Sequence, residues 1–228
     1  MKLSKPFIYP QSRKLRREEL HSVYQALRKA FGHQHWWPGE TPFEVIVGAI
    51  LTQNTAWTNV EKAIINLKEN GKLNPESLRR IAERGLAKLI RPAGYFNVKA
   101  NRLKHFIRFL YSEYQGRVER LRAERGDALR QKLLAVKGIG PETADSILLY
   151  AAQKPYFVID AYTKRVFARH RLLPRRHSYD AWQRLFQKAL PASVSLYNDF
   201  HAQIVAVGKR YCRTQPDCAN CPLHPFLS

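Results

Sequence analysis

Apolar residues along this chain recur mainly at intervals of three and four, the spacing that places them on one face of a helix. In one clear stretch, Ala144, Ile147, Leu148 and Ala151 follow this spacing. No pair of segments shows the strict alternation that would indicate neighbouring strands. The pattern therefore predicts an all-α protein with about ten helices around a shared core.

Segments rich in glycine and proline separate the predicted helices, because both residues break helical structure. The clearest breakers are the segments 35–39, 91–94 and 137–141. The helices are expected over the ranges Glu18–Phe31, Phe43–Thr52, Thr58–Asn70, Pro75–Arg84, Val98–Glu113, Asp127–Ala135, Pro141–Ala152, Asp160–Arg169, Tyr179–Ala189 and Tyr197–Arg210.

The composition indicates what kind of molecule this chain binds. Lysine and arginine number 39 against 18 aspartate and glutamate, a net charge of +21, and 45% of the residues are hydrophobic. A globular chain with this surplus is typical of a protein that binds nucleic acid, although ribosomal association or an acidic membrane surface would also attract it. No run of 18 apolar residues occurs, so no membrane span is expected.

The two ends of the chain differ in character. Residues 1–17 are basic and contain proline but lack the apolar segment of a secretory signal, so we expect a basic arm and a cytoplasmic protein. The three cysteines, Cys212, Cys218 and Cys221, lie together near the C-terminus. Such a cluster predicts a metal or iron–sulfur site in a reducing compartment rather than a disulfide framework.

The segment 133–145 predicts two helices joined by the tight turn Gly138-Ile139-Gly140. Glycine permits positive φ and close approach of the backbone to another molecule, and Pro141 suits the first position of a helix. Backbone N–H groups beside a helix N-terminus can grip a phosphate without reading sequence. The alternative is a plain helical hairpin. The residues expected to contact DNA are Lys137, Gly138, Ile139, Gly140 and Thr143.

One carboxylate follows this hairpin. The apolar run 156–159 ends in Asp160, and Gly140 precedes that residue by 20 positions. On local grounds Asp160 could be an ordinary helix N-cap. The hairpin, the spacing and the acid together resemble the signature of the endonuclease III superfamily of helix-hairpin-helix (HhH-GPD) DNA glycosylases. The segments 48–55 and 94–100 and the terminal cysteines extend this resemblance over roughly residues 20–222.

The resemblance implies two interlocked helical domains. A six-helix barrel would cover residues 35–153, and an N/C-terminal helical domain would combine residues 18–34 with 154–228. Double-stranded DNA would lie across the cleft of a monomer, with the damaged base flipped into a pocket. Asp160 would stabilise the oxocarbenium-like sugar and orient the attacking water.

The resemblance also bears on the type of reaction. Bifunctional members carry a lysine two residues after the second hairpin glycine, and its amine forms a Schiff base with the sugar. Here that position is Glu142, which cannot form an imine. We therefore expect a monofunctional enzyme with absent or weak lyase activity, although Lys137 or Lys164 could substitute.

Aromatic residues indicate which subfamily of these glycosylases the chain resembles. The segments Trp36-Trp37-Pro38 and 52–57 are similar to type III 3-methyladenine DNA glycosylases. That similarity implies a base pocket, with Trp57 stacking on the flipped base and Asn54 filling the hole left in the duplex. Core packing is the alternative for each tryptophan, and we assign Trp182 to the core. The expected pocket residues are Trp36, Trp37, Pro38, Trp57 and Lys209.

The cysteine spacing resembles the iron–sulfur loop of endonuclease III, except that Leu227 stands where a fourth cysteine is expected. Three possibilities follow. Cys212, Cys218 and Cys221 could hold a [4Fe–4S] cluster completed by His224 or solvent, they could bind zinc with His224, or they could bind no metal. In each case the role is structural, and the chemistry requires no cofactor.

Three functions are therefore compared. The first is a monofunctional glycosylase that hydrolyses the bond to an alkylated purine. The second is a bifunctional glycosylase and lyase acting on oxidised pyrimidines, which Glu142 argues against. The third is a non-catalytic DNA-binding protein, which has no need of Asp160.

Overall fold

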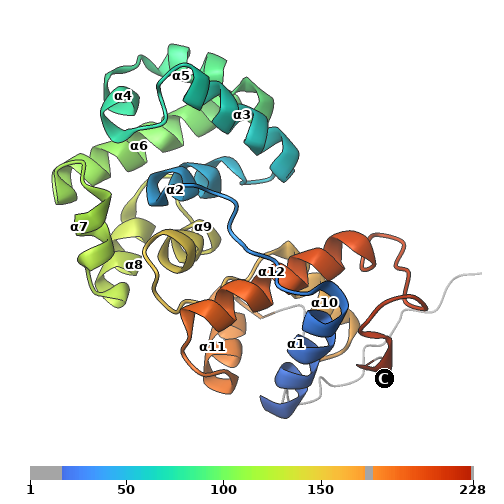
Figure 1. Ribbon diagram of the computed structural model, residues 1–228. Helices are drawn as coiled ribbons and strands as arrows, with labels where there is room; N and C mark the ends of the chain where they lie inside the picture. Colours follow the sequence, from blue (N-terminus) through green and yellow to red (C-terminus); the bar gives the residue numbers. More distant parts are fainter. Residues whose placement is uncertain (1–16, 173–176, 227–228) are drawn as a thin grey trace, which may run out of the picture. The chain divides into compact units, whose positions relative to one another are not determined.

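The computed structural model describes residues 17–172 and 177–226, and these form helices, turns and loops without a strand (Figure 1). The all-α prediction is confirmed for this part of the chain. The basic arm predicted for residues 1–17 lies outside the described residues except for Arg17, where α1 (Arg17–Phe31) begins. None of the described helices is long and apolar enough to cross a membrane.

The chain divides into two compact units. Among the described residues, the first comprises residues 17–34, 159–172, 177–191 and 199–226, and the second comprises residues 35–158 and 192–198. The domain ranges expected above, 35–153 for the barrel and 18–34 with 154–228 for the second domain, stay a prediction. The first unit contains α1, α10 (Ala161–Arg169), α11 (Tyr179–Ala189), most of α12 (Val194–Arg210) and the 3-10 turn η3 (His224–Phe226).

The second unit holds the remaining elements between residues 35 and 158. They are α2 (Pro42–Leu51), α3 (Trp57–Glu69), α4 (Pro75–Arg80), α5 (Glu83–Leu89), the 3-10 turn η1 (Arg91–Ala93), α6 (Phe96–Tyr114), α7 (Val118–Ala123), α8 (Gly126–Ala135), α9 (Pro141–Ser146) and the π-helical turn η2 (Ile147–Ala151).

Helix α2 is the centre of the second unit. Every residue from Phe43 to Leu51 is buried, as expected of a helix that is hydrophobic on all sides. The helix begins at Pro42 behind Thr41, whose hydroxyl accepts a hydrogen bond from the Glu44 amide at 3.1 Å. It packs against α3, α6, α9 and η2 within this unit, so the segments that carry the predicted DNA-binding residues share one core.

Aromatic rings form much of the core of the first unit. The rings of Phe167 and Phe186 lie 4.9 Å apart, and Phe200 lies 6.3 Å from Phe186. Trp182 is fully buried, which confirms its assignment to the core. These contacts join α10, α11 and α12, and Asp160 lies at the start of α10.

The predicted helix over 75–84 is wrong in one respect, because the chain is extended at Ile81 and separates α4 from α5. The ammonium group of Lys104 explains the break, since it donates to the carbonyl oxygens of Leu78 at 2.7 Å and Arg79 at 3.0 Å. A lysine that binds the last carbonyls of a helix stabilises its end. Helix α7 was not expected, because six residues are too few to show a helical period.

Candidate functional site

The predicted hairpin joins α8 to α9 through residues 136–140. Gly138 has a φ of +93°, a conformation that favours glycine, whereas Gly140 is extended and caps α9. A Cβ atom added to Gly140 would meet nothing within 4 Å, so packing inside the protein does not require glycine there. Ile139 is buried at 5% exposure between the two helices. The turn therefore presents an open backbone at the N-terminus of α9.

Gln53, which was not singled out as a contact residue, holds this hairpin to the loop after α2. Its Nε2 donates to the carbonyl oxygen of Gly138 at 3.0 Å and to the hydroxyl of Thr143 at 2.8 Å. The guanidinium of Arg102 donates to Gln53 Oε1. Thr143 is only 6% exposed, so its hydroxyl fixes the hairpin from within the protein.

Two exposed residues with left-handed backbone, Asn54 and Tyr95, lie in the same unit as Gln53 and the hairpin. Asn54 has a φ of +54°, and Tyr95, at the start of α6, has a φ of +44° with 74% of its surface exposed. Left-handed conformations are costly for residues other than glycine and cluster at functional sites. Tyr95 was missed from the sequence, because nothing in the sequence distinguishes an exposed tyrosine from a packed one.

A buried lysine connects the segments that carry these two residues. Lys99 is 1% exposed, and its Nζ donates to the carbonyl oxygens of Leu51 at 2.7 Å and Ala93 at 2.8 Å and to the Thr55 hydroxyl at 2.5 Å. Burial, with a smaller contribution from the charge of Arg102, lowers the pKa of Lys99 to about 8. Lys99 thus fixes the backbone on both sides of Asn54 and two residues before Tyr95.

The three tryptophans expected in the base pocket lie together in the second unit. The ring centroids of Trp36 and Trp37 are 5.3 Å apart, and those of Trp37 and Trp57 are 5.2 Å apart at an interplanar angle of 89°. Trp36 lies 6.4 Å from Trp57. These tilted and edge-to-face contacts are favourable for aromatic rings, so the cluster is a rigid wall of indole rings.

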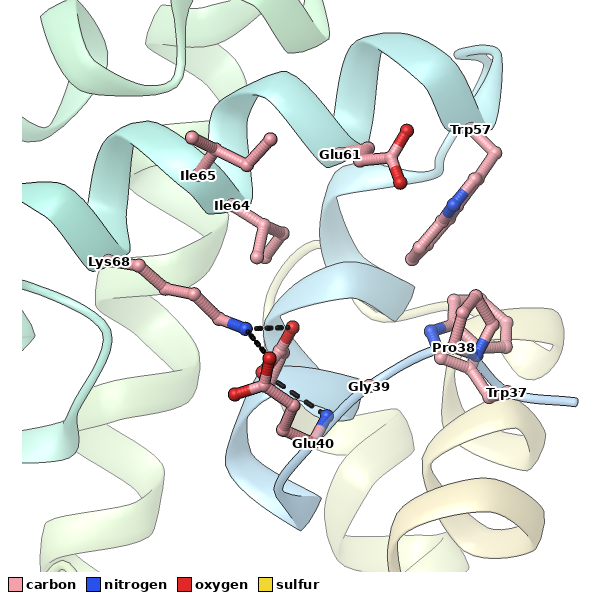
Figure 2. Close-up of a pocket in the computed structure, with 10 residues that line it drawn as sticks. Trp37, Pro38, Gly39, Glu40, Trp57, Glu61, Ile64, Ile65 and Lys68 are labelled. Atoms are coloured by element: carbon pink, nitrogen blue, oxygen red, sulfur yellow. Dashed lines mark hydrogen bonds and ion pairs between the residues drawn. The ribbon is translucent and has the colours of Figure 1, made fainter.

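An open pocket lies beside this cluster, and Figure 2 shows Trp57 projecting from α3 toward Trp37 and Pro38. Glu61 lines the same pocket one turn after Trp57 on α3. Lys68 binds the carboxylates of Glu40 at 2.8 Å and Glu44 at 3.0 Å. Three carboxylates and one ammonium group line this pocket, so its charge favours a cation.

Asp160 is the N-cap of α10 in the first unit. Its Oδ1 accepts hydrogen bonds from the Thr163 amide at 2.7 Å and the Thr163 hydroxyl at 2.8 Å. The Nε2 of His201 lies 3.6 Å from Oδ2. Burial alone would raise the pKa of Asp160, but His201 and the bonds from Thr163 outweigh it, so the pKa lies below its ordinary value. The carboxylate is therefore ionised at neutral pH.

The other two predicted site residues occupy exposed positions. Glu142 lies in the first turn of α9, where a carboxylate interacts favourably with the helix dipole. Lys209 is exposed in the last turn of α12 and belongs to the first unit, whereas the tryptophan cluster belongs to the second. The place of Lys209 in the base pocket stays a prediction.

The three cysteines line one small cavity in the first unit and are free thiols. Within residues 17–172 and 177–226, however, no group of three or more cysteine, histidine or acidic side chains is arranged to hold a metal. His224, considered as a fourth ligand, directs its Nδ1 to the carbonyl oxygen of Cys218 at 3.0 Å. Leu227 lies outside the described residues. The donor set as arranged does not fit a cluster or a zinc ion.

Two arginines of α10 hold the cysteine loop instead. Arg165 donates to the carbonyl oxygens of Cys212 at 2.6 Å and Gly208 at 2.9 Å. Arg169 donates to the Cys212 sulfur at 3.3 Å and to the Thr214 carbonyl oxygen at 3.3 Å. Hydrogen bonds from a fixed guanidinium satisfy backbone carbonyls directly, so the loop has protein contacts that support its shape.

Comparison with known proteins agrees with this arrangement. Residues 47–192 match the HhH-GPD superfamily of base excision DNA repair proteins. A protein of Methanocaldococcus jannaschii that carries the name of a DNA repair glycosylase is 45% identical over 210 residues, which are 92% of this chain and 96% of its own length. Endonuclease III of Thermotoga maritima is 30% identical over 181 residues, 79% of each chain.

Solved structures show the same fold. The 3-methyladenine DNA glycosylase of H. pylori, bound to 1,N6-ethenoadenine, matches with a TM-score of 0.74 and 30% identity over 86% of this chain and 98% of that one. An endonuclease III–DNA complex matches with a TM-score of 0.80 and 21% identity over 93% and 95% of the two chains. The chain therefore belongs to the HhH-GPD superfamily of base excision DNA repair proteins, and it is a DNA glycosylase.

Proposed function

We propose that this glycosylase is monofunctional and removes cationic alkylated purines, such as 3-methyladenine, by hydrolysis. The observation that carries the proposal is the pocket that Trp57, Trp37 and Pro38 line together with Glu61. Aromatic faces attract a cationic ring by about 0.5–2 kcal/mol, and carboxylates add to that attraction. The relative from H. pylori, named for 3-methyladenine, supports the same substrate class.

The proposed reaction begins when the damaged base leaves the duplex and enters the aromatic pocket. A positively charged purine is a good leaving group and needs no protonation, so no general acid is required. Asp160 supplies the charge that stabilises the oxocarbenium-like sugar and orients the water that adds to it. Its ionised carboxylate, buried at 9% exposure, suits that role because low polarity strengthens the interaction.

The proposed DNA contacts come from three places in the second unit. The turn at Gly138–Gly140 would bind a phosphate through backbone N–H groups, with the exposed Lys137 beside it. Asn54 and Tyr95, both exposed on strained backbone, would enter the duplex where the base has left. Gln53 and Lys99 hold these places in a fixed arrangement.

The experiment that tests this function measures base release from duplex DNA carrying alkylated purines, with strand nicking scored separately. We expect release of 3-methyladenine without nicking, because Glu142 cannot form the Schiff base that leads to strand cleavage. Several relatives are named endonuclease III, so duplexes with oxidised pyrimidines belong in the same assay. Nicking that borohydride traps as a protein–DNA adduct would overturn the monofunctional proposal and favour a substitute lysine, Lys137 or Lys164.

Replacing Trp57 by alanine is expected to reduce the single-turnover release of 3-methyladenine by about tenfold, since a cation–π contact is worth about 0.5–2 kcal/mol. Trp57→Phe, which keeps an aromatic face, should retain most of the rate. Ile65→Ala, on the same helix and also lining the pocket, is the matched control for loss of apolar surface. Equal rates for Trp57→Ala and Ile65→Ala would argue against stacking by Trp57.

Binding to duplex DNA is expected to weaken steeply as salt rises, because contacts to phosphates release counterions. Lys137→Ala should lower the slope of log affinity against log salt concentration by about 1. Lys88→Ala, which removes an exposed lysine of α5, serves as the matched control and should leave the slope unchanged. An affinity independent of salt would contradict the proposal that the positive charge meets DNA.

A further inference from the structure

The two oxygens of the Asp160 carboxylate have different surroundings. Oδ1 accepts both the amide and the hydroxyl hydrogen of Thr163, at 2.7 and 2.8 Å, and these bonds hold it at the start of α10. Oδ2 is therefore the oxygen that remains to act on a sugar or a water. His201 faces this second oxygen, with its Nε2 at 3.6 Å.

His201 reaches Asp160 from another helix. It lies on α12, is 4% exposed, and belongs to the same unit as Asp160. The groups that act on Asp160 are Thr163 of α10 and His201 of α12. Tyr179 of α11 contacts the residue before Asp160, because its hydroxyl accepts the Ile159 amide hydrogen at 3.3 Å. The His201 imidazole therefore faces Oδ2, the carboxylate oxygen that does not bind Thr163.

We propose that His201 is a positioning residue for base excision, which fixes the Oδ2 oxygen of Asp160 in place by facing it with an imidazole N–H. The inference rests on the proposed role of Asp160 at the sugar. A buried carboxylate without such a partner would tend to take up a proton, because burial disfavours its charge. An N–H group at Nε2, near Oδ2, counters that tendency, and it also limits rotation of the carboxylate.

A role in packing alone predicts different behaviour. If His201 only filled space, its replacement by a side chain of similar size would change the stability of the protein but not the dependence of the rate on pH. If His201 positions Asp160, loss of His201 lets the Asp160 carboxylate take up a proton at a higher pH. As the pH is lowered, the rate of the variant should therefore begin to fall at a higher pH than the rate of the wild type. The dependence of the rate on pH therefore separates the two roles.

The test compares His201→Leu with His201→Gln in single-turnover release of 3-methyladenine across a range of pH. We expect His201→Leu to lose about tenfold in rate at neutral pH, because a reacting group that is no longer held in position acts more slowly. The acid limb of the pH profile is the range in which the rate falls as the pH is lowered. The midpoint of this acid limb should rise by about one pH unit in His201→Leu. His201→Gln, whose amide can still donate, should recover most of the rate, and the affinity for DNA should stay unchanged in both variants.

His170→Gln is the matched control, since His170 is also a buried histidine of the first unit, at 8% exposure, but does not act on Asp160. Its rate and acid limb should match those of the wild type. A wild-type acid limb in His201→Leu would overturn the proposal. If that variant does not fold, the same comparison is made with His201→Gln and His201→Asn, and equal loss of rate in both would count against the role.

A second readout does not depend on the substrate. The carboxyl carbon of Asp160 can be followed by NMR as the pH changes, and it should titrate at a lower pH in the wild type than in His201→Leu. If the wild type releases no alkylated purine but this difference is present, the proposed function fails and the pairing of His201 with Asp160 stands. If the two titrations coincide, the pairing itself is wrong, whatever the substrate.

Discussion

Replacing Asp160 by asparagine is expected to reduce the single-turnover rate of base release by about three orders of magnitude, a loss typical of removing one electrostatic group from a reaction centre. The substitution is close to isosteric. Asparagine is as good an N-cap as aspartate, and its carbonyl oxygen can still accept the hydrogen bonds from Thr163. What disappears is the negative charge that stabilises the sugar cation in the proposed reaction, so the rate should fall while α10 stays folded.

The measurement pairs the rate of base release with DNA affinity and thermal unfolding. Asp199→Asn is the matched control, because Asp199 is a second buried aspartate of the same unit, bound to Arg28 at 2.8 Å and to the Tyr24 hydroxyl at 2.9 Å. That variant should lower the unfolding temperature and keep its rate. Asp160→Asn should keep the wild-type unfolding temperature and lose its rate. A near-normal rate would exclude Asp160 as the group that stabilises the sugar.

The long helices were predictable from the sequence because each buries a continuous apolar face and ends at a breaker. The extended residue Ile81 was not predictable, since the lysine that stabilises the end of α4 comes from α6. The division into two units also depends on contacts between distant segments, which periodicity within one helix does not report.

The candidate site shows the same limit. Asp160 and the hairpin glycines could be proposed from the sequence, because their spacing along the chain resembles the signature of the family. Gln53 and His201 were not singled out, because each acts on a partner far away in sequence, Gly138 for one and Asp160 for the other. A side chain whose role depends on a distant contact has no local pattern, so only the folded chain reveals it.

Lys99 was missed for the same reason, and its replacement by methionine should have the largest effect on stability. Methionine has nearly the same side-chain volume as lysine but cannot donate, so the buried carbonyl oxygen of Leu51 loses its side-chain partner. The carbonyl oxygen of Ala93 still accepts a hydrogen bond from the Thr55 hydroxyl at 2.7 Å. An unsatisfied buried acceptor costs about 1–3 kcal/mol, so the free energy of unfolding should fall by about that amount. Urea unfolding measures the loss. Lys62→Met, on the exposed side of α3, is the control.

The same variant should have weaker affinity for DNA, because Lys99 holds the backbone around Asn54 and before Tyr95. Without it, these side chains must be ordered when the duplex binds, and that ordering opposes binding. Affinity is measured on an undamaged duplex, at a temperature where both proteins are folded. Unchanged affinity together with reduced stability would restrict Lys99 to the core.

The dependence of stability on pH should reveal the lowered pKa of the buried Lys99. Its pKa is about 8 in the folded protein and 10.5 ordinarily. Between these values the unfolded chain binds more protons than the folded one, so the free energy of unfolding contributed by Lys99 rises with pH. Below about pH 8 both states carry the charge and the contribution is constant. Methionine has no proton to lose, so the difference in stability between wild type and Lys99→Met should widen as pH rises from about 8 toward 10.5. A constant difference would mean that the ammonium group is as favourably placed in the fold as in water.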